Sequence, residues 1–451
     1  MRRSLGALAP ELLLRLHERH PDRYPVLLES VGGSAQLGRY DVLFALPGPR
    51  LQLLPDGSLD GPREPAVGRF LDSLDAWWSS ERGAGQAPDD LPFSGGWFVY
   101  LGYELAGEIE PRLRLRESRL PRALAWRMYG AVVRDRLTGE AVACAEPRAP
   151  GTLREDLDAD LADTADAAHP ATAPLALVVE EDEPDRFLVG VEAILGAIAA
   201  GDVYQANLSR GWRARLTPGI GAGELYRRLR AANPAPFAGS ARLPGFTVLS
   251  SSPERLLRIV GRTASTRPIA GTRPRGVTMA RDASLRAELE LNEKERAEHV
   301  MLVDLERNDL GRICRGGTVK VDEYMTIESY TTVHHIVSNV SGELREDVTP
   351  GQAVAAVFPG GTITGCPKVR CMELLAGLEQ DPRDAYTGSM GYLGRDGTLD
   401  LNILIRTLTL RGDAIGFRTG AGIVADSRPE AELAETRAKA RGLLRALGSE
   451  T

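Results

Sequence analysis

The stretch FPGGTITGCPKVRCME, residues 358–373, places three glycines and two prolines within its first ten positions. Glycine and proline at this density interrupt helices and strands, and glycine lets backbone N–H groups come close to a ligand. Three further stretches have the same character: GDVYQANLSR (201–210), STRPIAGTRPRG (265–276) and GAGIVADS (420–427). Taken one at a time, each of the four is equally consistent with a tight turn.

The segments around these stretches indicate the fold class. DRFLVGVEAILGAIAAGD (185–202) has apolar residues at helical spacing and stops at Gly201, whereas FTVLSSSPERLLRIVG (246–261) and AIGFRTGAGIVAD (414–426) contain strand candidates. Helices and strands are mixed without a regular βαβ rhythm, which favours an α+β fold over a doubly wound parallel sheet. With 451 residues, 43% of them hydrophobic, the chain can bury a large core.

A change of composition divides the chain into three parts. Residues 146–184 are rich in Ala, Asp and Pro and contain no aromatic residue. We interpret this segment as a linker on the surface, poorly ordered and without a function of its own. It separates an N-terminal segment, residues 1–145, from a core of residues 185–451.

Charge and composition exclude several classes of protein. A net charge of -7 disfavours a nucleic-acid partner, because phosphate backbones reward an excess of Lys and Arg. The chain has no run of 18 apolar residues, and charged residues such as Glu11 and Arg15 interrupt the opening segment, so neither a membrane span nor a secretory signal is expected. Four cysteines are too few for a disulfide framework, and a cytoplasmic location is the default expectation.

Two helical segments carry the pattern Glu-x-x-Glu. Glu295 and Glu298 lie in KERAEHVMLVDL, and Glu432 and Glu435 lie in ELAETRAKARGLLRAL; at this spacing both acids share one helix face. Four carboxylates without a nearby cysteine suit a hard cation such as Mg²⁺. A di-iron site would need Glu-x-x-His, and His299 has the wrong spacing for it. A solvated helix face is the ordinary alternative.

The order of the motifs carries a resemblance to a known family. Together with EHVMLVDLERNDLGRIC (298–314) and ILIRTLTL (403–410), the four glycine- or proline-rich stretches resemble the chorismate-utilising enzymes. These comprise anthranilate synthase component I, aminodeoxychorismate synthase component I, isochorismate synthase and salicylate synthase. The resemblance is strong from residue 185 onward and is weaker before the linker. It implies a large sandwich-like fold of predominantly antiparallel sheets flanked by helices, with chorismate as the substrate.

The resemblance also implies a metal and a set of substrate ligands. Mg²⁺ would be held directly by Glu298 and Glu435, with Glu295 and Glu432 close behind. Arg406 would bind the enolpyruvyl carboxylate of chorismate through two parallel hydrogen bonds. The remaining positions that match the family's substrate site are Thr266, Thr362, Tyr386, Gly420, Gly422 and Lys439.

Three matched positions concern the chemistry. Glu254 corresponds to a general acid that protonates the leaving hydroxyl, and His335 to a histidine that transfers a proton or orients a group. Family members that add water carry Lys at the position of Gln205, whereas those that use ammonia carry Gln. The chain is therefore expected to aminate chorismate. None of its cysteines lies in the G-x-C-x-G setting of a glutaminase, so a separate glutamine amidotransferase subunit is the implied ammonia source.

The motifs divide between the two ammonia-using enzymes. Ala270 in PIAGT is typical of anthranilate synthase, which serves tryptophan biosynthesis, and offers no lysine for a covalent intermediate. FPGGTITGCPK and AYTGSMGYL instead resemble aminodeoxychorismate synthase, which serves 4-aminobenzoate and folate biosynthesis. We favour the latter and retain anthranilate synthase as the alternative. A non-catalytic chorismate-binding paralogue is disfavoured, because Glu298, Glu435 and Arg406 are all present.

The N-terminal segment shows one further similarity. LLES, residues 27–30, resembles the pocket in which family members bind tryptophan as an inhibitor or a structural ligand. A plain strand end is the alternative interpretation.

Overall fold

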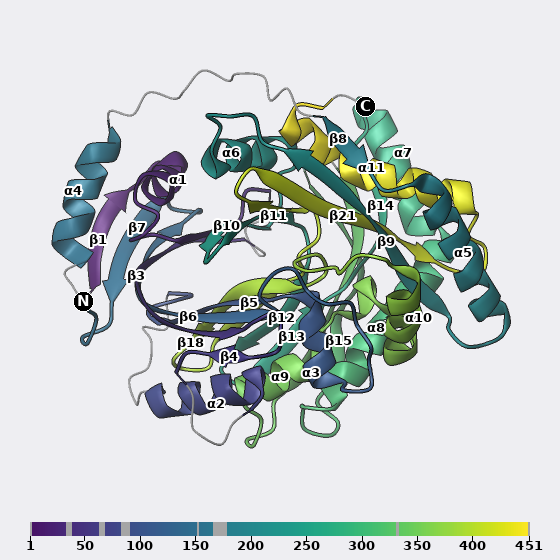
Figure 1. The fold of residues 1–451 in the computed structure, drawn as a ribbon, viewed down its shortest axis with the longest axis horizontal. Helices are drawn as coiled ribbons and strands as arrows, with labels where there is room; N and C mark the ends of the chain where they lie inside the picture. Colours follow the sequence, from purple (N-terminus) through teal and green to yellow (C-terminus); the bar gives the residue numbers. More distant parts are fainter. Residues whose placement is uncertain are drawn as a thin grey trace.

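Two long strands, β3 (Tyr40–Leu53) and β6 (Ala123–Asp135), pair along almost their whole lengths and connect two antiparallel sheets. The computed structural model describes residues 2–32, 38–62, 68–82, 91–150, 153–165, 178–330 and 333–449. Every strand pairing within these ranges is antiparallel (Figure 1).

The first sheet extends from β3 and ends at the strands that carry two of the glycine-rich stretches. Its order after β3 is β2 (Val26–Glu29), β10 (Phe237–Leu243), β11 (Phe246–Ser252), β20 (Thr407–Arg411), β21 (Ala414–Ile423) and β9 (Gln205–Arg215). The short strands β8 (Val179–Glu181) and β17 (Gly365–Cys366) also pair with β9.

The second sheet extends from β6 in the other direction. Its order is β5 (Gly96–Leu101), β18 (Ser389–Gly394), β19 (Leu399–Asn402), β12 (Arg255–Val260), β13 (Thr263–Arg267), β16 (Val333–Glu343) and β15 (Lys320–Ser329). Strand β14 (Ile269–Pro274) continues from β13 along the same edge of β16. At the N-terminal end, β7 (Glu140–Ala145) pairs with β6 and with β1 (Arg2–Ala7), and β4 (Leu59–Asp60) pairs with β3.

Helices cover the two sheets on opposite sides (Figure 1). The upper side in the figure carries α6 (Ala222–Ala232) and α11 (Pro429–Leu447), with α5 (Pro184–Ala199) to the right. The lower side carries α2 (Phe70–Glu81), α3 (Ala106–Ile109), α8 (Glu293–Gly311), α9 (Pro350–Val357) and α10 (Lys368–Leu378). The remaining helices are α1 (Pro10–Arg19), α4 (Leu153–Ala165), α7 (Met279–Leu291) and the 3-10 turns η1 (Tyr103–Leu105) and η2 (Gly361–Ile363).

Two apolar clusters hold these layers together. One packs α11, α6 and α1 against the first sheet, with Leu443, Leu229 and Leu249 fully buried. The other packs α2 and α9 against the second sheet and includes Phe70 and Leu257. The predicted α+β sandwich with antiparallel sheets and flanking helices is confirmed.

The segment that we interpreted as a linker has more structure than expected. Residues 153–165 form α4, which packs on α1, and the buried Asp160 accepts hydrogen bonds from Tyr24 at 2.9 Å and Arg23 at 2.6 Å. The interpretation as a poorly ordered connection is therefore wrong for these residues, because periodic leucines can pack a helix without any aromatic residue. Residues 151–152 and 166–177 of this segment lie outside the described ranges.

Candidate active site

Six buried polar atoms in or next to the sequence motifs described above have no hydrogen-bond partner. They are Gln205 Oε1, Asn207 Oδ1, Glu254 Oε1, Thr266 Oγ1, Thr362 Oγ1 and His335 Nε2. A buried polar group without a partner costs about 1–3 kcal/mol, so most such groups in folded proteins are paired. Unpaired atoms on three strands and two turns are the groups that a polar ligand would satisfy.

The close approach of β9 and β21 explains the two glycines of the GAG motif. A Cβ atom on Gly420 would lie 2.5 Å from Asn207 Oδ1 and 2.7 Å from the Tyr386 hydroxyl oxygen. A Cβ atom on Gly422 would lie 2.6 Å from Gln205 Nε2. At Gly420 the Leu208 carbonyl oxygen would also lie 2.8 Å from the Cβ atom, so a side chain there would push the backbone apart, whereas at Gly422 the Gln205 amide would have to move aside.

Lys439 connects this group to α11. Its Nζ donates to the Gly420 carbonyl oxygen at 3.0 Å and pairs with Glu435 at 2.7 Å. The structure thus brings together five predicted site residues at the β9–β21 edge: Gln205, Tyr386, Gly420, Gly422 and Lys439.

Glu254 lies between β11 and β12 and is only 5% exposed. Burial raises the pKa of its carboxyl to about 7, while a backbone N–H and the charges of Lys439 and Arg406 act to lower it. An acid with a pKa near the working pH can both hold and release a proton, which is what general acid catalysis requires. Glu254 is therefore not an exposed surface glutamate.

His335 is 2% exposed, and burial together with the Arg406 charge lowers its pKa to about 3. The ring is therefore neutral. Its Nδ1 lies 2.9 Å from the Thr272 hydroxyl and 3.4 Å from the Gly271 carbonyl oxygen. Because a carbonyl can only accept, this contact favours the proton on Nδ1 and leaves Nε2 as a free base. The neighbouring His334 instead binds Ser329 and Asp282, which gives it a structural role.

Arg406 lies in the segment LNILIRTLTL (401–410), at a break between two strands. The segment forms β19 and β20, and Arg406 between them has φ +52°, a left-handed conformation that is uncommon outside glycine. Burial lowers the pKa of its guanidinium, and the Glu254 charge opposes this effect. The break directs Arg406 away from the strand ladder and brings its charge near Glu254 and His335.

The acids of α8 and α11 are placed differently from one another. Glu295 pairs with Arg273 at 2.7 Å and faces Gly271, next to the half-buried Ala270 of the PIAGT motif on β14. Glu298 is half-buried on α8 and Glu432 is buried on α11. Within the described ranges no three His, Cys, Asp or Glu side chains gather closely enough to hold one ion. The donor set still fits Mg²⁺, which needs only one or two protein carboxylates besides water and substrate oxygens.

Sequence reasoning missed several residues of this region. Asn207 lies two positions after Gln205 on β9, and the period of two along a strand could have revealed that both side chains share a face. Glu306 is a buried acid on α8 beside Thr266, and Arg383 is a buried arginine before Tyr386. A charged residue in a helix or turn gives no sign of its burial in the sequence alone.

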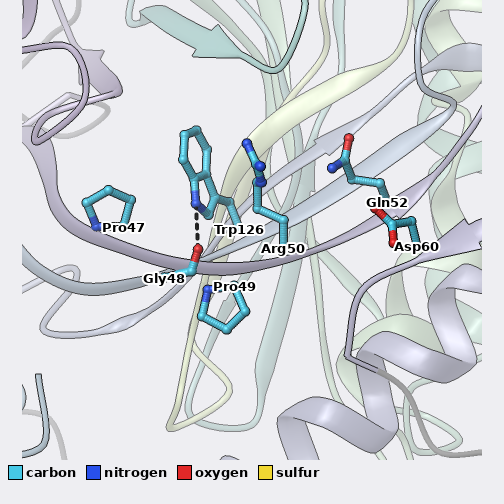
Figure 2. Close-up of a pocket in the computed structure, with 7 residues that line it drawn as sticks. All are labelled: Pro47, Gly48, Pro49, Arg50, Gln52, Asp60 and Trp126. Carbon is cyan, nitrogen blue, oxygen red and sulfur yellow. Dashed lines mark hydrogen bonds between the residues drawn. The ribbon is translucent and has the colours of Figure 1, made fainter. Parts of the chain in front are cut away.

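Two other features lie apart from this group. A pocket of about 380 Å³ on β3 and β6 is lined by none of the predicted site residues (Figure 2). Its lining residues are Pro47, Gly48, Pro49, Arg50, Gln52, Asp60 and Trp126.

In the LLES segment, Glu29 is buried and accepts hydrogen bonds from Tyr226 at 2.9 Å and Arg230 at 3.0 Å. Tryptophan binding there stays a prediction. The described residues contain no helix long and apolar enough to cross a membrane.

Comparison with known proteins agrees with this geometry. A family model described as chorismate binding enzyme matches residues 62–445. The chain belongs to this family. It is 42% identical over 417 residues to the anthranilate synthase component I-like protein of Synechocystis sp., across 91% of this chain and 83% of that protein. Over 263 residues it is 49% identical to aminodeoxychorismate synthase component 1 of Bacillus subtilis, across 58% of this chain and 56% of that protein.

A solved structure with a similar fold also comes from a chorismate-utilising enzyme. Anthranilate synthase component I from Streptococcus pneumoniae matches with a TM-score of 0.77 and 30% sequence identity, covering 90% of this chain and 92% of that one. The chain is a chorismate-utilising enzyme, and the predicted family is confirmed. The names of its relatives divide between two products.

Proposed function

We propose that this chain is the chorismate-aminating component of an aminodeoxychorismate synthase, which converts chorismate and ammonia to 4-amino-4-deoxychorismate. The observation that carries the proposal is the buried Gln205, whose amide lies against Gly422 with its Oε1 unpaired. A neutral amide at this position cannot deprotonate water. Ammonia needs no such base, because its lone pair is already free at the moment of attack.

The substrate's two carboxylates find cationic and donor groups at this site. Arg406 binds the enolpyruvyl carboxylate through its planar guanidinium, which matches a carboxylate in a bidentate fashion. Further donors would come from the Tyr386 hydroxyl, which lies against Gly420, and from the backbone around Gly420. Magnesium, when bound by the carboxylates of α8 and α11, would draw negative charge toward the ring carboxylate during the reaction.

The leaving hydroxyl requires a proton, which Glu254 holds. In the proposed step the C4–O bond breaks, Glu254 protonates the departing oxygen to give water, and ammonia forms the new C4–N bond. The amine keeps its three hydrogens as an ammonium group, so atoms and charge balance. His335, neutral and with a free Nε2, accepts or orients a proton near the ring.

A specific observation favours a second candidate. Ala270 stands in the PIAGT motif, and the anthranilate synthase component I-like relative aligns with 91% of the chain. Anthranilate synthase would attack at C2 and eliminate pyruvate. Amination at C4 is supported by the higher local identity, 49%, to an aminodeoxychorismate synthase component and by the AYTGSMGYL motif.

A product assay tests the proposal. Purified chain is incubated with chorismate, Mg²⁺ and an ammonium salt, and the products are separated by mass. We expect 4-amino-4-deoxychorismate, which retains the pyruvyl group and yields 4-aminobenzoate only after a lyase is added. Fluorescent anthranilate as the main product would reverse the choice in favour of the second candidate. Replacing Ala270 with Lys in a parallel sample shows whether an amine at this position changes the product.

A glutamine amidotransferase subunit is the proposed source of ammonia, since both kinds of relative are named as a first component. We expect the isolated chain to use ammonium salts and not glutamine. Glutamine-dependent amination by the purified chain alone would contradict the need for a second subunit.

A further inference from the structure

Arg383 is a buried arginine that touches none of the unpaired atoms of the candidate site. It is 3% exposed and lies between α10 and β18. Its Nε and Nη2 donate to the two carboxylate oxygens of Glu379, each at 2.8 Å. Glu379 in turn accepts from the backbone and hydroxyl of Ser209 at 2.9 and 2.7 Å. Glu379 thus neutralises the charge of Arg383 within the buried interior.

The other donors of Arg383 reach three segments that line the site. Nη2 donates to the Asn207 carbonyl oxygen at 2.7 Å, and Nη1 donates to the Ile363 carbonyl oxygen at 3.0 Å. Nη1 also donates to the Thr387 hydroxyl at 3.3 Å. Asn207 shares β9 with Gln205, Ile363 follows Thr362 in η2, and Thr387 follows Tyr386. One side chain therefore connects three groups of predicted site residues.

The loop around Tyr386 needs such support. Asp384 and Thr387 have φ values of +51° and +62°, in the left-handed region that non-glycine residues rarely adopt. Residues held in this region persist only where surrounding contacts fix them. Besides the Arg383 side chain, the buried Glu104 of η1 accepts from the backbone N–H groups of Arg383 and Asp384, at 2.8 and 3.3 Å.

We propose that Arg383 is a positioning residue for the reaction of this site. It fixes Tyr386, Thr362 and the start of β9 relative to one another, so that substrate contacts from three segments form together. The proposal rests on the proposed function only in taking chorismate as the ligand and holds for amination at either carbon. Lysine cannot replace the guanidinium, because an ammonium group is a compact donor that cannot span four acceptors in a plane.

Arg127 on β6 provides a matched control. It is 1% exposed and donates to Glu81 and Glu146, each at 2.7 Å, and to the carbonyl oxygens of Gly96 and Met128 at 2.9 and 3.0 Å. It therefore resembles Arg383 in burial and in its two kinds of acceptor. None of its partners belongs to the candidate site.

The experiment compares Arg383→Lys with Arg127→Lys in the full chain. Thermal unfolding is followed by circular dichroism, kcat and KM are measured with chorismate and ammonium, and chorismate binding is measured by calorimetry. We expect similar losses of thermal stability in both variants. Only Arg383→Lys should lose kcat/KM, by about 100-fold, which is typical of a misplacement of about 1 Å at an active site. Equal kinetic losses in both variants would overturn the proposal.

Two further arms separate positioning from stability. Tyr386→Phe should lower kcat/KM much less in the Arg383→Lys background than in the wild-type chain, because the Tyr386 hydroxyl is already misplaced there. Fully additive losses would contradict the proposal. If Arg383→Lys does not fold, Thr387→Val removes one acceptor and should raise KM severalfold; an unchanged KM would overturn the proposal.

The binding measurement keeps this proposal separate from the proposed function. A wild-type chain that binds chorismate but forms no aminated product would defeat the proposed function. Even in that case, Arg383→Lys should bind chorismate more weakly than Arg127→Lys does. Equal chorismate binding by the two variants would defeat the positioning role.

Discussion

Helices α8 and α11 carry the same Glu-x-x-Glu spacing in different surroundings. On α8, Glu295 is largely buried and is held by Arg273 from β14. On α11, the side chain of Glu435 is 48% exposed, and its partner Lys439 lies on the same helix, one turn later. The spacing places each pair on one helix face, but the neighbours from other elements decide how rigidly each carboxylate is held.

The two helices also carry different residues near Glu254. Lys439 of α11 lowers the pKa of Glu254. Glu306 of α8 is a buried acid, and Glu254 raises the pKa of Glu306. The comparison teaches that a shared motif does not fix the electrostatics of its helix, because both residues that interact with Glu254 lie outside the Glu-x-x-Glu pairs.

The largest expected effect comes from the acids proposed to bind the metal directly. Glu298→Gln and Glu435→Gln each remove a charge while keeping the shape of the side chain. We expect Mg²⁺-dependent turnover to fall by about 10²–10³-fold, comparable to the loss of one key electrostatic contact in other active sites. Initial rates across a Mg²⁺ titration provide the measurement. Near-normal activity in a folded Glu298→Gln protein would refute the metal assignment on α8.

A smaller effect is expected from the second acid of each pair. Glu295→Gln and Glu432→Gln should weaken Mg²⁺ dependence by about 10-fold, as substitutions behind direct metal ligands commonly do. Because Arg273 fixes Glu295, Arg273→Met should reproduce most of the Glu295→Gln effect, while a change at an exposed arginine such as Arg307 should not. If Glu295→Gln proves as damaging as Glu298→Gln, the assignment of direct and indirect ligands on α8 is exchanged.

These outcomes bear on how much the sequence could predict. Helical periodicity located α5, α8 and α11, and strand patterns located β11, β12 and β21, because each pattern depends on neighbours within the same element. The family resemblance also singled out Glu254, His335 and Tyr386, which the structure buries and whose roles stay predictions. It could not predict the break at Arg406, since the left-handed turn there depends on packing between two strands. For the same reason it missed Arg383, whose acceptors lie on distant segments.

The third prediction concerns pH. Glu254 acts while protonated, so kcat should be high below a pKa of about 7 and should fall as the pH rises above it. Lys439→Met removes a positive charge that lowers this pKa, and the alkaline limb should move to higher pH. Because Lys439 is 44% exposed, the shift should be a few tenths of a pH unit, reduced by solvent screening. A limb that moves to lower pH would contradict the assignment to Glu254.

The smallest effect is expected on the α8 side of the same acid. Burial, the neighbouring Asp309 and Glu254 raise the pKa of Glu306 above its usual range, while Lys368 lowers it. Glu306 should therefore remain neutral at a pH where an ordinary glutamate is charged. A neutral neighbour exerts no like-charge repulsion, so Glu306→Gln should leave the limb near pH 7 almost unchanged.

The pH profile can nevertheless show which member of this pair ionises first. Two interacting acids titrate as a pair, and their apparent pKa values belong to both groups. With Glu306→Gln, the ionisation that belongs mainly to Glu306 should disappear while that of Glu254 remains. If Glu306→Gln instead moves the alkaline limb of the kcat profile down by a whole pH unit, Glu306 is already charged when Glu254 ionises. In that case α8 sets the pKa of the general acid, and the contribution of Lys439 on α11 is the minor one.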